Sequence, residues 1–178
     1  MARIFPENPV GLRSDAERRF YQACTALPDD WVVLAHVPLV GRGREGEIDF
    51  IVAHPEVGVV VVEVKGGQVG FDAASGLWYS IDRHGVRHDL VPGPFDQAQA
   101  NAHHLVEMLA SIPVTARHRY PFAWAVALPD VQVPGRLGPI PPDVILDHDA
   151  LATLQPGLRR AAAALVRRPW ASRAAGAR

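Results

Sequence analysis

Cysteine is almost absent from this chain of 178 residues, which contains Cys24 alone. A single cysteine cannot form an internal disulfide bond, and it excludes a zinc site built from several cysteines. Because Cys24 falls on the expected apolar face of a helix, we interpret it as a small buried hydrophobic residue. A reactive thiol is the less favoured alternative.

Long apolar runs are absent as well. A helix that spans a bilayer needs about 20 apolar residues, and the longest apolar stretch, Val57 to Val62, contains a glycine and is followed by a charge. The first six residues contain no apolar segment of the kind found in secretory signals. Without an export signal or disulfide bonds, the sequence predicts a cytoplasmic protein with no membrane partner.

A strong net charge is also missing, since 18 Lys and Arg residues stand against 19 Asp and Glu residues, for a net charge of −1. Many nucleic-acid binders are strongly basic overall. Contacts to nucleic acid would therefore come from local patches, for which the candidates are Arg42, Arg44, Arg83 and Arg87. Each of these alone is more commonly a solvated surface charge than a phosphate contact.

The residues that are present predict one domain over residues 1–170 and a disordered tail over residues 171–178. Ser14 and Glu17 form an S-x-x-E capping box at the start of a helix over residues 14–26. Apolar residues at helical spacing predict a second helix from Pro94 to Ser111. A last helix, interrupted near Pro156-Gly157, is expected to run to about Val166.

Strands are expected between these helices. Glu47–Ala53 and Val59–Lys65 carry apolar residues on both faces, which is typical of strands covered by helices on each side. The element order predicts an α/β (α+β) fold with a central mixed β-sheet flanked by helices. Further strands are expected at residues 31–37, 68–72, 77–82, 122–128 and 144–147.

The two central strands flank a turn at residues 54–58. If this turn is symmetric about Glu56, opposed residues have numbers that sum to 112, and Asp49 lies opposite Glu63. Opposed side chains share a face with their Cβ atoms about 5 Å apart, and like charges there are destabilising unless they are compensated. A divalent cation such as Mg²⁺ is a natural compensation.

Lys65 projects from the same face as Glu63 because it lies two residues later. A metal held by the acids would activate water and polarise a phosphate, and the lysine would orient that water or stabilise charge on phosphorus. The alternative is an ordinary salt bridge, for example Lys65 with Glu47, which the same arithmetic pairs. The run of valines before Glu63 favours the functional interpretation, because exposed charges are hard to accommodate there.

Two segments, Gly46-Glu47-Ile48-Asp49-Phe50-Ile51-Val52 and Val60-Val61-Val62-Glu63-Val64-Lys65-Gly66-Gly67, resemble the nuclease-related domain (NERD) of the PD-(D/E)XK nuclease superfamily. The helix start at Ser14, the pair Trp78-Tyr79 and the segment Pro94-Phe95-Asp96-Gln97-Ala98 extend this resemblance over about residues 12 to 130. The resemblance implies a restriction-endonuclease-like core and a nuclease activity that depends on Mg²⁺ or Mn²⁺.

The resemblance also implies roles for individual residues. Asp49 and Glu63 match the metal-binding acids, and Lys65 matches the catalytic lysine. Glu17 matches the helical acid that can complete the metal site, and its role in the capping box is an equally favoured alternative. Gln97 matches a glutamine that supports catalysis. Glu47 is interpreted as a structural partner of Lys65.

The predicted function is hydrolysis of DNA phosphodiester bonds, with RNA as an alternative substrate. A second interpretation is a non-catalytic domain of the same fold that binds nucleic acid or recruits a partner. Hydrolysis of another phosphodiester is a third. By analogy with the superfamily we also expect a helicase or other DNA-processing partner and a homodimer.

Overall fold

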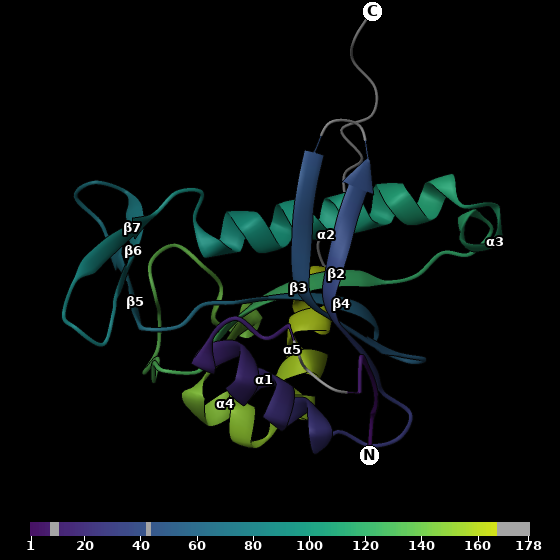
Figure 1. Ribbon diagram of the computed structural model, residues 1–178, viewed down its shortest axis with the longest axis horizontal. Coiled ribbons are helices and arrows are strands. Elements are labelled where there is room, and N and C mark those ends of the chain that lie inside the picture. The colour runs from purple at the N-terminus through teal and green to yellow at the C-terminus, as the bar shows by residue number, and fades with distance from the viewer. Residues whose placement is uncertain (8–10, 42–43, 167–178) are drawn as a thin grey trace, which may run out of the picture.

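A six-stranded mixed β-sheet with the strand order β1-β2-β3-β4-β8-β9 forms the centre of the molecule (Figure 1). The computed structural model describes residues 1–7, 11–41 and 44–166. The strands are β1 (Arg3–Phe5), β2 (Val32–Gly41), β3 (Arg44–His54), β4 (Gly58–Val64), β8 (Phe122–Leu128) and β9 (Ile145–Asp147). Strands β2, β3 and β4 are antiparallel, whereas the β1–β2, β4–β8 and β8–β9 pairs are parallel. The mixed sheet predicted from the sequence is confirmed.

Helices cover both faces of this sheet (Figure 1). The helices are α1 (Asp15–Thr25), α2 (Pro94–Ser111), α3 (Pro113–Ala116), α4 (His148–Ala152) and α5 (Leu154–Val166), with a 3₁₀ turn at Pro142–Val144. Helices α1, α4 and α5 lie on one face and α2 on the other. No helix in the described ranges is long and apolar enough to cross a bilayer.

The central strands bury side chains on both of their faces. Phe50 and Val62 belong to the apolar cluster under α1 and α5, whereas Ile51 and Val61 belong to the cluster under α2. All four side chains are buried. This division accounts for the apolar residues on both faces of β3 and β4, because each face of a covered sheet needs its own apolar set.

The predicted register of the central hairpin is confirmed. The pairs from Phe50↔Val62 to His54↔Gly58 all have numbers that sum to 112. Pairing stops before Asp49, and β3 continues with β2 alone as a two-stranded arm (Figure 1). The predicted pairing of Glu47 with Lys65 is wrong, because Glu47 pairs with Pro38 of β2 on this arm.

A second, three-stranded sheet contains β5 (Gln68–Asp72), β6 (Leu77–Ile81) and β7 (Arg87–Leu90). It joins the main core through Trp78, whose ring lies 4.7 Å from that of Phe95 in α2. Strand β7 was not predicted, because its residues Arg87 to Asp89 are polar and exposed and show no alternating apolar pattern.

The helix predictions are largely confirmed. The second helix has its predicted bounds, and α1 lies within the predicted 14–26. The interruption of the last helix falls at Thr153, not at Pro156-Gly157. Pro156 instead lies in the first turn of α5, where a proline is tolerated because its missing N–H would have no helical partner. The predicted tail over residues 171–178 lies outside the described residues.

Candidate active site

Asp49 lies where β3 ceases to pair with β4 and where its pairing with β2 is interrupted at one position. The ladder positions opposite it, His36 in β2 and Glu63 in β4, are both missing from the strand pairing. The Asp49 side chain accepts a hydrogen bond from the backbone N–H of Val64, with an N···Oδ2 distance of 2.8 Å. The carboxylate thus bridges the gap between the two strands and is held beside the end of β4.

Glu63 and Lys65 lie together at that end. Glu63 is 5% exposed, and its Oε1 atom lies 2.8 Å from Nζ of Lys65. The backbone N–H of Lys65 donates to the carbonyl oxygen of Ala127 in β8 at 3.0 Å. The structure therefore brings Asp49, Glu63 and Lys65 to one place, as the sequence predicted, and makes Glu63 the ion-pair partner of the lysine.

The electrostatics of this cluster are unfavourable for two ionised carboxylates. The pKa of Asp49 is raised to about 7, first by burial and second by the neighbouring charge of Glu63, whereas the Val64 N–H and Lys65 act in the opposite direction. Glu17 also contributes to the increase. The negative charge of the acids is thus only partly balanced by Lys65, and a bound cation would relieve the rest.

Glu17 has the predicted capping role. Its Oε1 accepts from the Ser14 hydroxyl at 3.0 Å, and its Oε2 accepts from the Arg13 N–H at 2.8 Å. The Ser14 hydroxyl in turn accepts from the Glu17 N–H at 3.1 Å, as in a capping box, whereas the carboxylate reaches the N–H of the residue before the N-cap. Because Glu17 is buried and raises the pKa of Asp49, it also adds negative charge to the site. Its role as a metal ligand stays a prediction.

Glu47 contacts residues other than Lys65. One carboxylate oxygen lies 2.9 Å from a guanidinium nitrogen of Arg13, and the other forms a hydrogen bond with Nδ1 of His36. Nε2 of His36 lies 3.3 Å from Oε2 of Glu17. Sequence reasoning missed His36, because an isolated histidine in an apolar strand carries no signal of what its ring will contact.

The side-chain amides of Gln97 and Asn101 lie one helical turn apart on α2 and form hydrogen bonds with different parts of the structure. The Gln97 side chain donates to the Pro92 carbonyl oxygen at 3.0 Å and so holds the turn before the helix. Asn101 directs its Nδ2 atom to Oε2 of Glu63 at 3.5 Å and to the Glu47 carbonyl oxygen at 3.4 Å. Sequence reasoning missed Asn101, although its i, i+4 spacing from Gln97 could have indicated it.

The acids fit a metal that takes much of its coordination from water and substrate. No group of three His, Cys, Asp or Glu side chains in the described ranges is placed to hold a metal ion. Mg²⁺ commonly binds through one or two carboxylates together with waters and substrate phosphates. Asp49 and Glu63 are such a pair, and the raised pKa of Asp49 indicates that their charge is not compensated within the protein.

A groove of about 790 Å³ begins directly after Lys65, where Gly66 and Gly67 line it. A Cβ atom at Gly66 would lie 3.1 Å from Cβ of Ala16, so α1 approaches the end of β4 closely. The opposite wall is the turn between β6 and β7, which carries Arg83. The groove therefore joins the start of α1, the segment that follows Lys65 and the second sheet.

The charges along the groove are largely paired. Arg19 forms a salt bridge with Asp130, whereas Arg83 forms no salt bridge within the described part of the chain. The pKa of Asp15 is lowered mainly by Arg18 and less by Arg19 and Arg83. Arg83 thus acts across the groove on α1, and its Nε atom donates a hydrogen bond to Nε2 of His84 at 3.2 Å.

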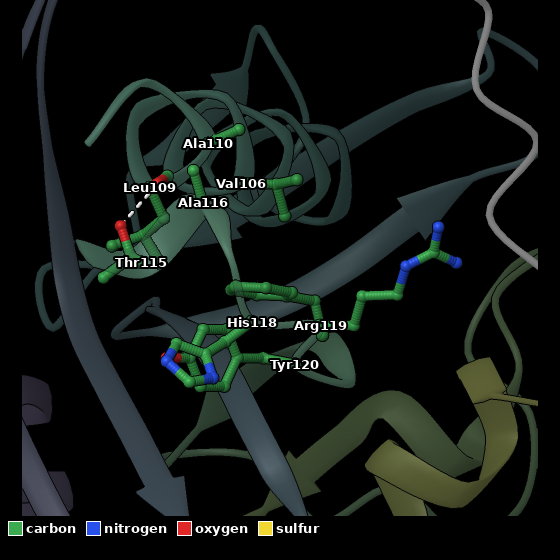
Figure 2. A pocket seen from close by; sticks show the side chains of 9 residues that line it. Val106, Leu109, Ala110, Thr115, Ala116, His118, Arg119 and Tyr120 are labelled. Carbon is green, nitrogen blue, oxygen red and sulfur yellow. Dashed lines mark hydrogen bonds between the residues drawn. The ribbon is translucent and has the colours of Figure 1, made fainter. Parts of the chain in front are cut away.

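A second hollow, of about 440 Å³, lies beside the C-terminal half of α2. Figure 2 shows that Val106 and Leu109 of α2 face it together with Thr115, His118 and Tyr120 of the following segment. Its lining is mainly apolar and contains no carboxylate. This pocket is therefore unsuited to hold a divalent cation.

Comparison with protein families matches residues 12–129 to the model of the nuclease-related domain, NERD. The matched segment contains every residue of the acid cluster and both amides of α2. Searches of the curated proteins and of the solved structures gave no match.

Proposed function

This chain belongs to the nuclease-related domain family. We propose that it is a metal-dependent nuclease that hydrolyses DNA, and that Asp49, Glu63 and Lys65 form its active site. One observation carries the proposal. Asp49, partly buried within β3, and Glu63, buried near the end of β4, lie beside a single ammonium group, and burial together with the charge of Glu63 raises the pKa of Asp49 to about 7.

The residues divide the work of phosphodiester hydrolysis between them. Asp49 and Glu63 would hold Mg²⁺ or Mn²⁺, and Glu17 would add negative charge behind them. The cation, when bound, supplies a Lewis acid and an activated water. Lys65, whose side chain is 27% exposed, orients that water or stabilises charge on phosphorus. Asn101 holds the carboxylate of Glu63, and the predicted supporting role of Gln97 would act through the turn before α2.

DNA is the proposed substrate, and RNA presents the same phosphodiester chemistry. The groove beside Gly66 supports this proposal, because it begins at the residue after Lys65 and carries Arg83, which forms no salt bridge within the described part of the chain. A helicase or other DNA-processing partner and a homodimer are further proposals by analogy with the superfamily.

A cleavage assay tests the proposal. The protein is incubated with linear, nicked, branched and single-stranded DNA and with RNA, in Mg²⁺, in Mn²⁺ and in EDTA. Glu63→Ala and Lys65→Ala should abolish cleavage, whereas Glu107→Ala, which removes an exposed acid on α2, should not. Folding of each variant is checked by circular dichroism. Binding of nucleic acid without cleavage in any metal would overturn the proposal in favour of a recruitment domain of the same fold.

A further inference from the structure

His36 has an unusual backbone conformation in the interior of β2. Its φ is 54°, and it is the one non-glycine residue in the described ranges with a positive φ. Histidine adopts this region more readily than most residues, but the conformation is still disfavoured and persists only where the surroundings enforce it. The residue lies at the ladder position opposite Asp49, where pairing between β2 and β3 is interrupted.

The ring of His36 lies between two acids from different elements. Nδ1 forms a hydrogen bond with Glu47 of β3, and Nε2 lies 3.3 Å from Oε2 of Glu17 of α1. The His36 side chain is 16% exposed. Nε2 has no partner with good hydrogen-bond geometry, although it is buried. The ring therefore fills the space between the two acids, and the charge of Glu17 is its nearest polar neighbour on that side.

The rest of the structure leaves the far side of Glu17 open to this contact. Helix α1 is held to the sheet by apolar side chains such as Phe20 and Cys24, which do not touch the carboxylate of Glu17 by hydrogen bonds. Ser14 and the Arg13 N–H bind the carboxylate from the helix start. His36 contacts it from the sheet and so limits how far the carboxylate, whose charge acts on Asp49, can turn.

We propose that His36 is a positioning residue of the metal site, which holds the Glu17 carboxylate toward Asp49 and Glu63. This inference rests on the proposed function, because it assigns a role at the same site. The left-handed backbone of His36 coincides with the interruption of the ladder opposite Asp49, whose carboxylate accepts the hydrogen bond from Val64.

Mn²⁺ binding measured by calorimetry, together with the thermal unfolding midpoint, tests the inference. His36→Gly removes the ring but adopts a positive φ without steric cost, so we expect it to fold and to bind Mn²⁺ on the order of tenfold more weakly than the natural chain. His36→Asn, which also tolerates a positive φ, should bind with intermediate affinity. If the glycine variant does not fold, the Mn²⁺ affinity of His36→Asn is compared with that of the natural chain instead.

Two further variants separate positioning from a general structural effect. If His36 acts through Glu17, adding His36→Gly to Glu17→Gln should weaken Mn²⁺ binding no further. His54→Asn is the matched control, because His54 is a buried histidine paired with Asp30 at 2.8 Å and lies at the opposite end of β3. It should lower the unfolding midpoint and leave Mn²⁺ affinity unchanged.

The outcomes are distinguishable. Natural protein that binds Mn²⁺ and cleaves DNA while His36→Gly binds equally well overturns the role of His36 and leaves the proposed function standing. If His36→Gly weakens Mn²⁺ binding equally with and without Glu17→Gln, the proposal that His36 acts through Glu17 is overturned as well. Natural protein that binds no Mn²⁺ overturns the metal site and this inference together.

Discussion

The carboxylate of Asp49 accepts a hydrogen bond from the backbone N–H of Val64 across the point at which β3 and β4 cease to pair. The bond lies in the middle of the cluster of acids and ties the candidate metal ligand to the backbone of the strand that carries Glu63 and Lys65. Asp49 therefore has an architectural role beside its proposed role as a metal ligand, and an amide substitution can separate the two experimentally.

Asp49→Asn should keep the architecture and remove the chemistry. The amide oxygen can still accept the Val64 hydrogen bond, whereas the charge that opposes Glu63 is lost. Because the folded-state pKa of Asp49 is raised from 3.8 to about 7, ionisation destabilises the natural fold as pH rises through this window, and the loss is complete above it. We expect the variant to be more stable than the natural chain at pH 8, by on the order of a few kcal/mol.

Denaturant unfolding at pH 4 and at pH 8 measures this difference. The stability advantage of Asp49→Asn should be small at pH 4, where the carboxyl of the natural chain is largely protonated in the folded state, and larger at pH 8. Cleavage should be absent at both. A variant that is less stable than the natural chain at pH 8 would contradict the assigned cause of the raised pKa.

Metal should stabilise the natural fold at neutral and alkaline pH. A ligand that binds only the folded state adds about 2.7 kcal/mol at one hundred times its dissociation constant. We expect Mn²⁺ to raise the unfolding midpoint of the natural chain and EDTA to reverse the rise. In a variant that carries both Asp49→Asn and Glu63→Gln, Mn²⁺ should not change the unfolding midpoint. A rise equal to that of the natural chain would show that the ion binds at another site.

The two amides of α2 should differ in their effect on cleavage. Asn101→Ala removes the group that reaches Glu63 and should lower the rate about tenfold, in line with the loss of a residue that orients a metal ligand. Gln97→Ala removes a bond to the Pro92 carbonyl and should have a smaller effect. Single-turnover cleavage of both variants decides the order. The reverse order would support the catalytic role that the sequence predicts for Gln97.

Arg83→Ala should weaken nucleic-acid binding and reduce its salt dependence by about one counterion. Its side chain lies on the wall of the groove and forms no salt bridge among the described residues. Arg117→Ala is the control, because Arg117 is exposed at the end of α3, at the opposite end of α2 from the second sheet (Figure 1). Fluorescence anisotropy over a range of salt concentrations measures how steeply the affinity of each variant falls with salt. An equal salt dependence for Arg83→Ala and Arg117→Ala would exclude the groove as the nucleic-acid binding site.

The local parts of this architecture could be predicted from the sequence. The capping box at Ser14, the bounds of α2 and the register of the β3–β4 hairpin each depend on residues close together in the chain. The symmetric turn about Glu56 was enough to bring Asp49 of β3 beside the end of β4 that carries Glu63.

The remaining features depend on contacts between distant segments. Glu47 could not be assigned its partners without knowing that β2 lies beside β3 and that Arg13 reaches across to it. The separation of β3 from β4 at Asp49 accompanies the parallel pairing of Glu63 with Val126 in β8, some sixty residues later. The left-handed conformation of His36 has no local cause in the sequence, since neither a glycine nor a turn marks it.

The short turn between β3 and β4 has a consequence for the order of folding. Asp49, Glu63 and Lys65 belong to a hairpin, which closes early because its loop is short and costs little entropy. Glu17 and Asn101 arrive from helices that dock through contacts of higher sequence separation. The mutual repulsion of the acids therefore acts on the nascent hairpin before the helices are in place, so an ion that binds the hairpin early would accelerate folding as well as stabilise its product.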